Sequence, residues 1–191
     1  MFIKKVALIT GFALATSSLA NAKPPKGNYA IDSSHTSVTF TVDHMGYSRL
    51  VGGFNDVSGI INIAEKTDSS MNIEIKTASI DTNHAKRDIH LKSPDFFNAK
   101  QFPVIRFTSP LHIDESEEVV TLTGELELLG VTKPIELALH KGKEGEDPWG
   151  LYRIGYNANV TLKRSDYGMN FMQGGVGDDI AISISVEAIK Q

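Results

Sequence analysis

The chain has no cysteine among its 191 residues. This absence excludes a disulfide framework, thiol catalysis, a lipid anchor on an N-terminal cysteine, and zinc or iron–sulfur centres with cysteine ligands. Beyond its N-terminal segment the sequence also has no run of 18 apolar residues, the length typical of a transmembrane helix. We therefore expect neither a disulfide-stabilised scaffold nor an integral membrane segment.

Basic side chains are fewer than acidic ones. The chain has 19 Lys and Arg against 23 Asp and Glu, a formal net charge of −4. Removal of Lys4 and Lys5 with the N-terminal segment described below leaves 17 basic side chains and a net charge of −6. Negative charge disfavours contact with a phosphate backbone, so nucleic acid is not an expected partner.

Catalytic and metal-binding motifs are missing as well. The sequence contains neither HExxH nor GxSxG, and none of its six histidines has the spacing of a metal site. His84 and His90 are six positions apart, which does not place them on one helical face. Asp178 and Asp179 are adjacent, so in an extended strand they point to opposite faces and cannot share acid–base catalysis. We predict no metal site, no cofactor and no enzymatic activity.

The first 22 residues have the composition of a secretory signal peptide. Lys4 and Lys5 precede an apolar run at residues 6–14, and Ala20-Asn21-Ala22 is a typical cleavage site. This pattern predicts export to the periplasm and a mature chain of residues 23–191. A mature chain of this length fits one domain with a sizeable core.

Most of the remaining chain alternates apolar and polar residues with a period of two, as strands do. Eight such segments, with mostly short polar connections, predict a mainly β fold with an antiparallel sheet closed into a barrel or packed as a sandwich. A barrel is favoured because closure leaves no exposed edge strand. The interior of an eight-stranded barrel can be filled by side chains or hold one small ligand, and periodicity leaves both open. The predicted strands are residues 37–42, 57–63, 71–76, 105–107, 120–128, 135–140, 152–163 and 180–187.

One long segment, residues 79–107, interrupts the strand pattern between the third and fourth predicted strands. Asp81, Thr82 and Asn83 are all suitable N-caps for one or two helical turns at residues 84–91. Ser93-Pro94-Asp95 resembles a second helix start, and Phe96 and Phe97 would follow it as apolar anchors. The sequence predicts a short helical insertion here.

Two polar residues fall on the apolar side of the alternation. His44 is in phase with Val42, and Arg164 is in phase with Val160, each at the end of its strand. Such residues could hold a polar ligand group at the mouth of a barrel. They could equally form a structural ion pair, such as Arg164 with Asp166, or mark strands that end one residue earlier.

Five stretches, in the same order, resemble the YceI family along essentially the whole mature chain. The resemblance implies a lipocalin-like, eight-stranded antiparallel barrel with a helical insertion, exported to the periplasm, whose lumen binds polyisoprenoid or other lipid-like chains. On the signature stretches lie His44, Arg87, Asp88, His90, Phe96, Phe97, Arg164 and Asp166. The matching stretches are DSSHTSVTFTVDHMGYSRLVGGF, SIDTNHAKRDIHLKSPDFF followed by FPVIRF, GELELLGVTKPI, RSDYGM, and GGVGDDIAISISVEA.

These observations lead to a binding or carrier protein as the first hypothesis. The polar end of the ligand would contact His44, Arg87 and Arg164, with Asp166 beside Arg164. The alternatives are an enzyme or accessory factor acting on an isoprenoid or quinone with a membrane redox partner, and a filled barrel that serves as an interaction module. A homodimer is left open. The tunnel wall is predicted to include Phe40, Val42, Phe54, Phe96, Phe97, Phe107, Leu126 and Val160.

Overall fold

The computed structural model describes residues 24–64, 68–111 and 118–191. The predicted signal peptide, residues 1–22, lies outside the described residues. Among the described residues, no helix has the length and apolar character needed to cross a membrane.

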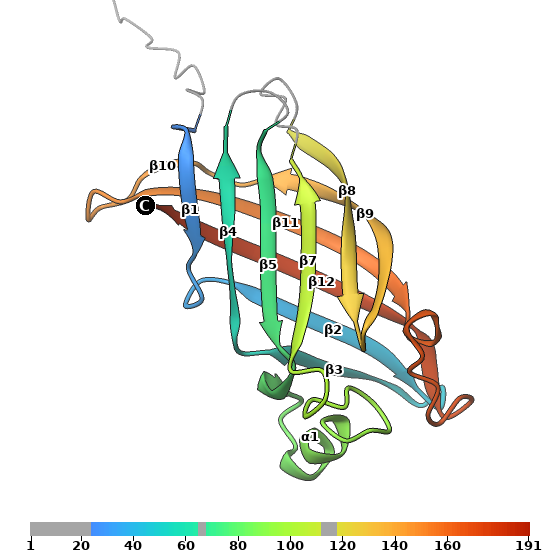
Figure 1. Ribbon diagram of the computed structural model, residues 1–191. Helices are drawn as coiled ribbons and strands as arrows, with labels where there is room; N and C mark the ends of the chain where they lie inside the picture. Colours follow the sequence, from blue (N-terminus) through green and yellow to red (C-terminus); the bar gives the residue numbers. More distant parts are fainter. Residues whose placement is uncertain (1–23, 65–67, 112–117) are drawn as a thin grey trace, which may run out of the picture.

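Twelve strands, one α-helix and two 3-10 turns make up the described part of the chain (Figure 1). The helical elements are α1 (Ala85–Leu91), η1 (Thr77–Ser79) and η2 (Arg164–Tyr167). The strands are β1 (Gly27–Ile31), β2 (Ser37–His44), β3 (Ser48–Phe54), β4 (Val57–Ile63), β5 (Ser70–Lys76), β6 (Ile80–Asp81), β7 (Val104–Pro110), β8 (Val119–Leu128), β9 (Val131–Lys141), β10 (Gly145–Glu146), β11 (Tyr152–Lys163) and β12 (Val176–Lys190).

The sheet closes on itself into an antiparallel barrel. The ring runs β1, β4, β5, β7, β8, β9, β11 and β12, and β12 then pairs with β1 through Ala188 opposite Ile31. These eight strands confirm the predicted fold class. The closure is unequal around the ring: β11 and β12 pair over eleven residues, whereas β9 and β11 pair only through Tyr156 with Lys141 and Asn157 with His140. Pairing on both sides removes most of the open strand edges that an alternating sequence would otherwise expose.

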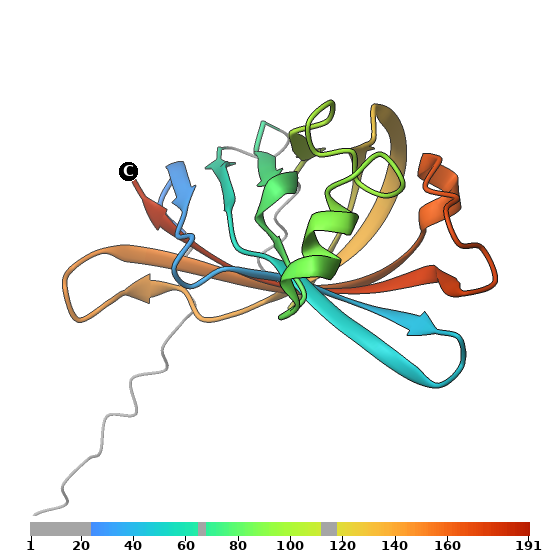
Figure 2. The same ribbon diagram turned by 90° about the horizontal axis from the view of Figure 1, so that it is seen from below.

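The barrel wall continues beyond this ring at one end. β12 pairs with β1 near its C-terminus and with β2 through most of its length, so β1 and β2 follow one another along the same edge. β3 pairs with β2 as β4 pairs with β1, and the β2–β3 hairpin extends the wall toward the end where α1 lies (Figures 1 and 2). The sequence did not predict β1, β3, β6 or β10 as strands.

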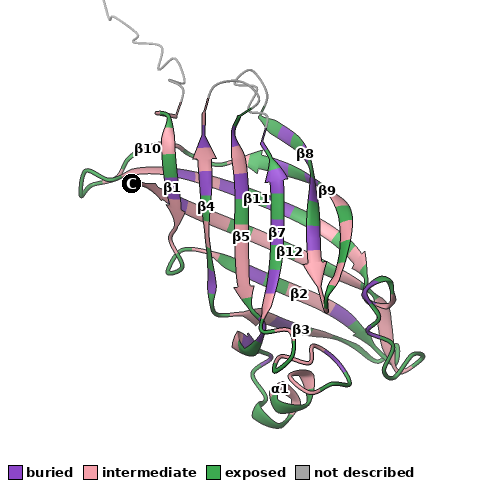
Figure 3. Ribbon diagram, in the orientation of Figure 1, coloured by how far each residue is buried: buried purple, intermediate pink, exposed green. Residues whose placement is uncertain are grey.

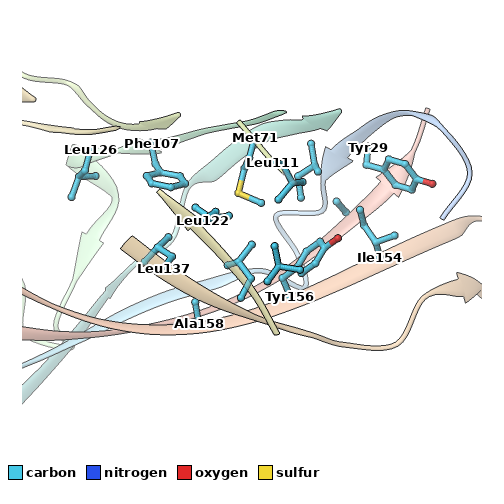
Figure 4. Packing of buried hydrophobic residues seen from close by; sticks show 14 of the residues in the cluster. Tyr29, Met71, Phe107, Leu111, Leu122, Leu126, Leu137, Ile154, Tyr156 and Ala158 are labelled. Carbon is cyan, nitrogen blue, oxygen red and sulfur yellow. The ribbon is translucent and has the colours of Figure 1, made fainter. Parts of the chain in front are cut away.

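The interior is solid at the end of the barrel away from α1. Tyr29, Ile61, Leu111 and Ala188 are fully buried, and Ile154 is nearly so. Figure 4 shows Tyr29 and Ile154 on one side of this cluster and Phe107 and Leu126 on the other. Figure 3 shows buried and exposed residues alternating along the strands, as the period-two pattern predicts.

The insertion between β5 and β7 is helical, as predicted, but its N-cap is His84. Its side chain accepts a hydrogen bond from the Arg87 amide. Two of the expected caps have other partners: Asp81 accepts from the Asn83 amide, and the Thr82 hydroxyl donates to Asp88. The predicted second helix at Ser93-Pro94-Asp95 is wrong, because these residues form turns.

Gly124 in β8 makes room for an aromatic ring in the barrel wall. A Cβ at this position would lie 2.4 Å from Phe107 Cζ and 2.7 Å from the Thr108 carbonyl oxygen. We expect Gly124→Ala to lower the free energy of unfolding by about 1–3 kcal/mol, because the Phe107 ring must move. Chemical denaturation of the variant and the wild type measures this difference in the free energy of unfolding.

The matched control is Gly155→Ala in β11. A Cβ there meets nothing closer than 3.7 Å. Equal losses of stability in the two variants would contradict the steric argument.

Candidate functional site

An apolar cavity of about 200 Å³ occupies the half of the barrel that the solid core leaves open. The residues of the solid end, including Tyr29, Ile61 and Leu111, are not part of its lining, so the cavity is blind at that end. At the other end it reaches Leu91 of the insertion and Met169 of the loop after η2. We call this second end the mouth.

Nine of the twelve predicted site residues line the cavity. They are Phe40, Val42, Phe54, Phe96, Phe97, Phe107, Leu126, Val160 and Arg164. Eight of these side chains are apolar; six lie on strands, as expected from their alternation, and Phe96 and Phe97 lie in turns of the insertion.

Phe96 and Phe97 have two structural roles. Both line the cavity, and both attach the insertion to other elements. The Phe97 ring packs edge-on against Phe54 of β3, with ring centroids 5.5 Å apart. Phe96 packs against His90 and Phe171 at 5.1 and 5.4 Å. The insertion therefore forms part of the cavity wall at the mouth.

Arg164 is the charged residue among the described residues that line the cavity, and it is 3% exposed. Its guanidinium donates to four backbone carbonyl oxygens, two in the loop after η2 and two at the start of β12. Nε donates to Gly177 at 2.9 Å, Nη1 to Met169 and Phe171 at 2.8 Å, and Nη2 to Val176 at 3.0 Å. Burial lowers the pKa of Arg164, and the charge of Asp178 opposes that shift. Arg164 thus fixes the loop at residues 169–177 and leaves a buried positive charge at the mouth.

The remaining three predicted residues lie outside the cavity lining. His44 is exposed at the end of β2. Arg87 donates to the Thr82 hydroxyl and carbonyl at 2.7 Å each, which ties α1 to the segment that follows β6. Asp166 is exposed and pairs with Lys133 at 3.4 Å, so the expected ion pair between Arg164 and Asp166 is not the one that forms.

Several lining residues were not predicted as site residues. Leu91, Tyr167 and Met169 lie in the insertion and the η2 loop, where strand periodicity gives no signal. The inward face of β12 was visible in its alternation but was not singled out. Burial raises the pKa of Tyr156, another lining residue, to about 12, so its hydroxyl stays neutral at ordinary pH. Further lining residues from β9 and β12 are Ile135, Leu137, Leu139, Val176, Ile180, Ile182, Ile184 and Val186.

A second polar cluster lies at the opposite end, around Arg153 of β11. Arg153 donates to Asp147 at 2.7 Å and Asp32 at 2.5 Å, and it lies 3.2 Å from Glu187. His35 joins through Asp32 at 2.8 Å. Asp32, His35 and Glu187 offer ligand atoms within 4.8 Å of one another, but a cation side chain already neutralises two of them. We interpret this cluster as structural.

The cluster makes stability depend on pH. Hydrogen bonds from Ser34 and Arg153 hold the pKa of Asp32 far below its usual value. A carboxyl whose pKa is lowered by folding stabilises the protein above its unfolded pKa of about 3.9, and this contribution is lost as the pH falls. We expect Asp32→Asn to cost about 1 kcal/mol at pH 7. The difference from the wild type should shrink below pH about 4.

Urea unfolding midpoints of the two proteins between pH 7 and pH 3 measure this difference. A gap that stays constant over that range would show that the Asp32 charge is not responsible.

Comparisons with known proteins match this architecture. A family model for the YceI-like domain matches residues 29–188. The chain belongs to the YceI family. A UPF0312 protein of Shewanella sp. strain MR-7 is 38% identical over 189 residues, covering 97% of this chain and 96% of that protein. A UPF0312 protein of Shewanella denitrificans is 37% identical over 190 residues, with 97% of both chains covered.

Solved structures of YceI-like proteins share the fold. The Campylobacter jejuni YceI protein has a TM-score of 0.69 at 32% identity, covering 78% of this chain and 90% of that one. A polyisoprenoid binding domain from Saccharophagus degradans has a TM-score of 0.70 at 17% identity, covering 85% and 98%. At that identity the likeness shows the fold alone. The YceI family assignment therefore rests on the family model and the closer relatives.

Proposed function

We propose that this YceI-family protein is a periplasmic carrier that binds a long-chain isoprenoid or another lipid-like molecule inside its barrel. The observation that carries the proposal is the blind apolar cavity, whose one charged lining residue, Arg164, lies at the mouth. An apolar chain would enter toward the solid core, with its polar end at the mouth. The predicted signal peptide supports the periplasmic location, and the solved polyisoprenoid binding domain with the same fold supports the ligand class.

Burial of the chain supplies the driving force. Each buried methylene contributes roughly 0.8 kcal/mol, so ten of them nominally contribute about 8 kcal/mol before ordering costs are subtracted. Burial alone discriminates poorly between chains of neighbouring length. Selectivity should therefore come from the length of the cavity and from polar groups at the mouth.

The size of the cavity limits how the chain can lie. At about 200 Å³ it is smaller than the roughly 300–1,000 Å³ of typical ligand pockets. A chain of about forty carbons fits only if lining side chains move or if part of the chain extends through the mouth. We propose that ligand binding widens the cavity near Phe96 and Phe97, where the wall is formed by the insertion.

The test is the identification of bound lipid. The protein is purified from a periplasmic extract without detergent, extracted with organic solvent, and the extract is analysed by mass spectrometry. We expect an isoprenoid or similar long-chain lipid in a near-stoichiometric amount. Protein that contains no lipid and takes up no isoprenoid from solution would overturn the proposal.

A further inference from the structure

Five large apolar side chains are exposed on the elements that surround the mouth of the cavity. Tyr47 is 88% exposed and Ile89 is 70% exposed. Met45, Phe171 and Met172 are each between 39% and 48% exposed. We call these five residues the rim. Single exposed apolar residues are common on protein surfaces, but a contiguous group of them marks an interaction site.

The rim joins three elements that are far apart in sequence. Met45 and Tyr47 lie in the β2–β3 turn, and the Met45 amide donates to the Gly175 carbonyl at 3.0 Å. A Cβ on Gly175 would lie 3.2 Å from the Met172 methyl and 3.5 Å from the Met45 methyl, so both methyl groups converge there.

The third element is α1. The Phe171 ring packs against His90 with centroids 5.4 Å apart, and Ile89 is the neighbouring residue of the helix. Figure 1 shows α1, the β2–β3 turn and the loop before β12 at the lower end of the barrel, and Figure 2 views the molecule from that end.

The rim is continuous with the cavity wall. Phe171 packs against Phe96 at 5.4 Å, and Phe96 lines the cavity. Met169 and Val176, on either side of Phe171 and Met172, also line it. A chain leaving the cavity through the mouth would therefore pass directly onto apolar rim side chains.

The insertion beside the rim has an excess of positive charge. Residues 85–100 contain four basic side chains and two acidic ones, whereas the whole chain has a net charge of −4. Basic clusters next to apolar side chains are typical of surfaces that bind anionic membranes. The basic residues are Lys86, Arg87, Lys92 and Lys100.

We propose that the rim docks onto the surface of an anionic lipid bilayer, with the mouth facing the membrane. Tyr47 and the two methionines would enter the interfacial region, where an amphipathic tyrosine ring is favoured, and the insertion lysines would contact lipid phosphates. This inference rests on the proposed carrier function. It gives the ligand a route that never exposes its chain to water.

The test is flotation of the full mature protein with vesicles of equal parts phosphatidylethanolamine and phosphatidylglycerol. We expect Tyr47→Ser combined with Ile89→Ser to weaken vesicle binding at least tenfold. Both side chains are exposed, so folding should be unaffected, which circular dichroism verifies. Wild-type binding should also weaken in pure phosphatidylcholine vesicles and at high salt.

The matched control is Trp149→Ser combined with Leu151→Ser. These residues are 79% and 43% exposed, in the loop between β10 and β11 at the other end of the barrel (Figure 1). The control should bind vesicles as the wild type does. Loss of binding in the control but not in the rim variant would overturn the proposal by assigning docking to the opposite end.

Three further outcomes separate docking from the carrier function and from dimerisation. Protein that contains lipid but does not float with vesicles would overturn docking and leave the carrier function intact. Wild-type dimers in sedimentation that the rim variant loses, without vesicle binding by either, would assign the rim to a second copy of the chain and also overturn docking. Protein that floats but contains no lipid and takes none up would support docking and overturn the carrier function.

Discussion

Val160→Trp is expected to abolish lipid binding while leaving the barrel folded. Val160 lies in the middle of β11, opposite Ile182 of β12, and both side chains line the cavity. A Trp ring there would occupy a large part of a space of about 200 Å³. The ring would fill empty volume, so the melting temperature should fall little. Lipid recovered by extraction, per mole of protein, should drop at least tenfold.

Thr161→Trp is the matched control, since it places the same side chain one residue along the same strand. Thr161 is exposed and points to the outside of the barrel. The Thr161→Trp variant should retain its lipid. Full lipid content in Val160→Trp, with the wild-type fold, would show that the ligand does not occupy this cavity.

Arg164→Met should destabilise the protein strongly, by about 3 kcal/mol in chemical denaturation. The substitution keeps much of the side-chain volume but removes the donors to the carbonyls of Met169, Phe171, Val176 and Gly177. Buried acceptors without donors cost about 1–3 kcal/mol each, moderated where the loop opens to water. The loop at residues 169–177 should become sensitive to limited proteolysis before the rest of the barrel does.

Lys163→Met is the comparison for Arg164→Met. Lys163 is the preceding residue, its side chain is 58% exposed, and it pairs with Asp179 at 2.9 Å on the outer surface. Exposed pairs contribute at most about 1 kcal/mol. If both variants lose the same stability, the four carbonyl contacts of Arg164 do not organise the loop.

Periodicity predicted the barrel well because burial enforces it. In β5, β7, β8 and β12 a shift of one residue would turn every apolar side chain outward, so the sequence carries a strong signal. β3 lacks this signal because an inward position is occupied by Gly52 and not by an apolar side chain. A Cβ there would lie 2.5 Å from Phe40 Cζ, so the Phe40 ring fills the place of a side chain. β1 is short and has only Tyr29 and Ile31 as large apolar residues.

The cavity could not be predicted from the same pattern. Inward apolar residues look alike whether they fill a core or line a hollow, and the difference depends on how side chains from opposite walls meet. Leu122 and Leu137 pack in the buried core, while Leu137 and Leu126 also line the cavity. Alternation correctly placed Arg164 on the inner face. Its partners are backbone carbonyls of the loop after η2 and of the start of β12, and backbone acceptors give no signal in the residue types.

The pairing of β12 has a consequence for how the chain folds. This last strand bonds to β11 along most of its length and also to β1 and β2, which are among the first strands of the described chain. Pairs such as Ile31 with Ala188 join opposite ends of the sequence, and contacts of such long separation slow folding. The barrel cannot close until the C-terminus has been made. Until β12 has been made, the sides of β1 and β11 that it pairs with stay open, and they can pair with strands of other chains instead.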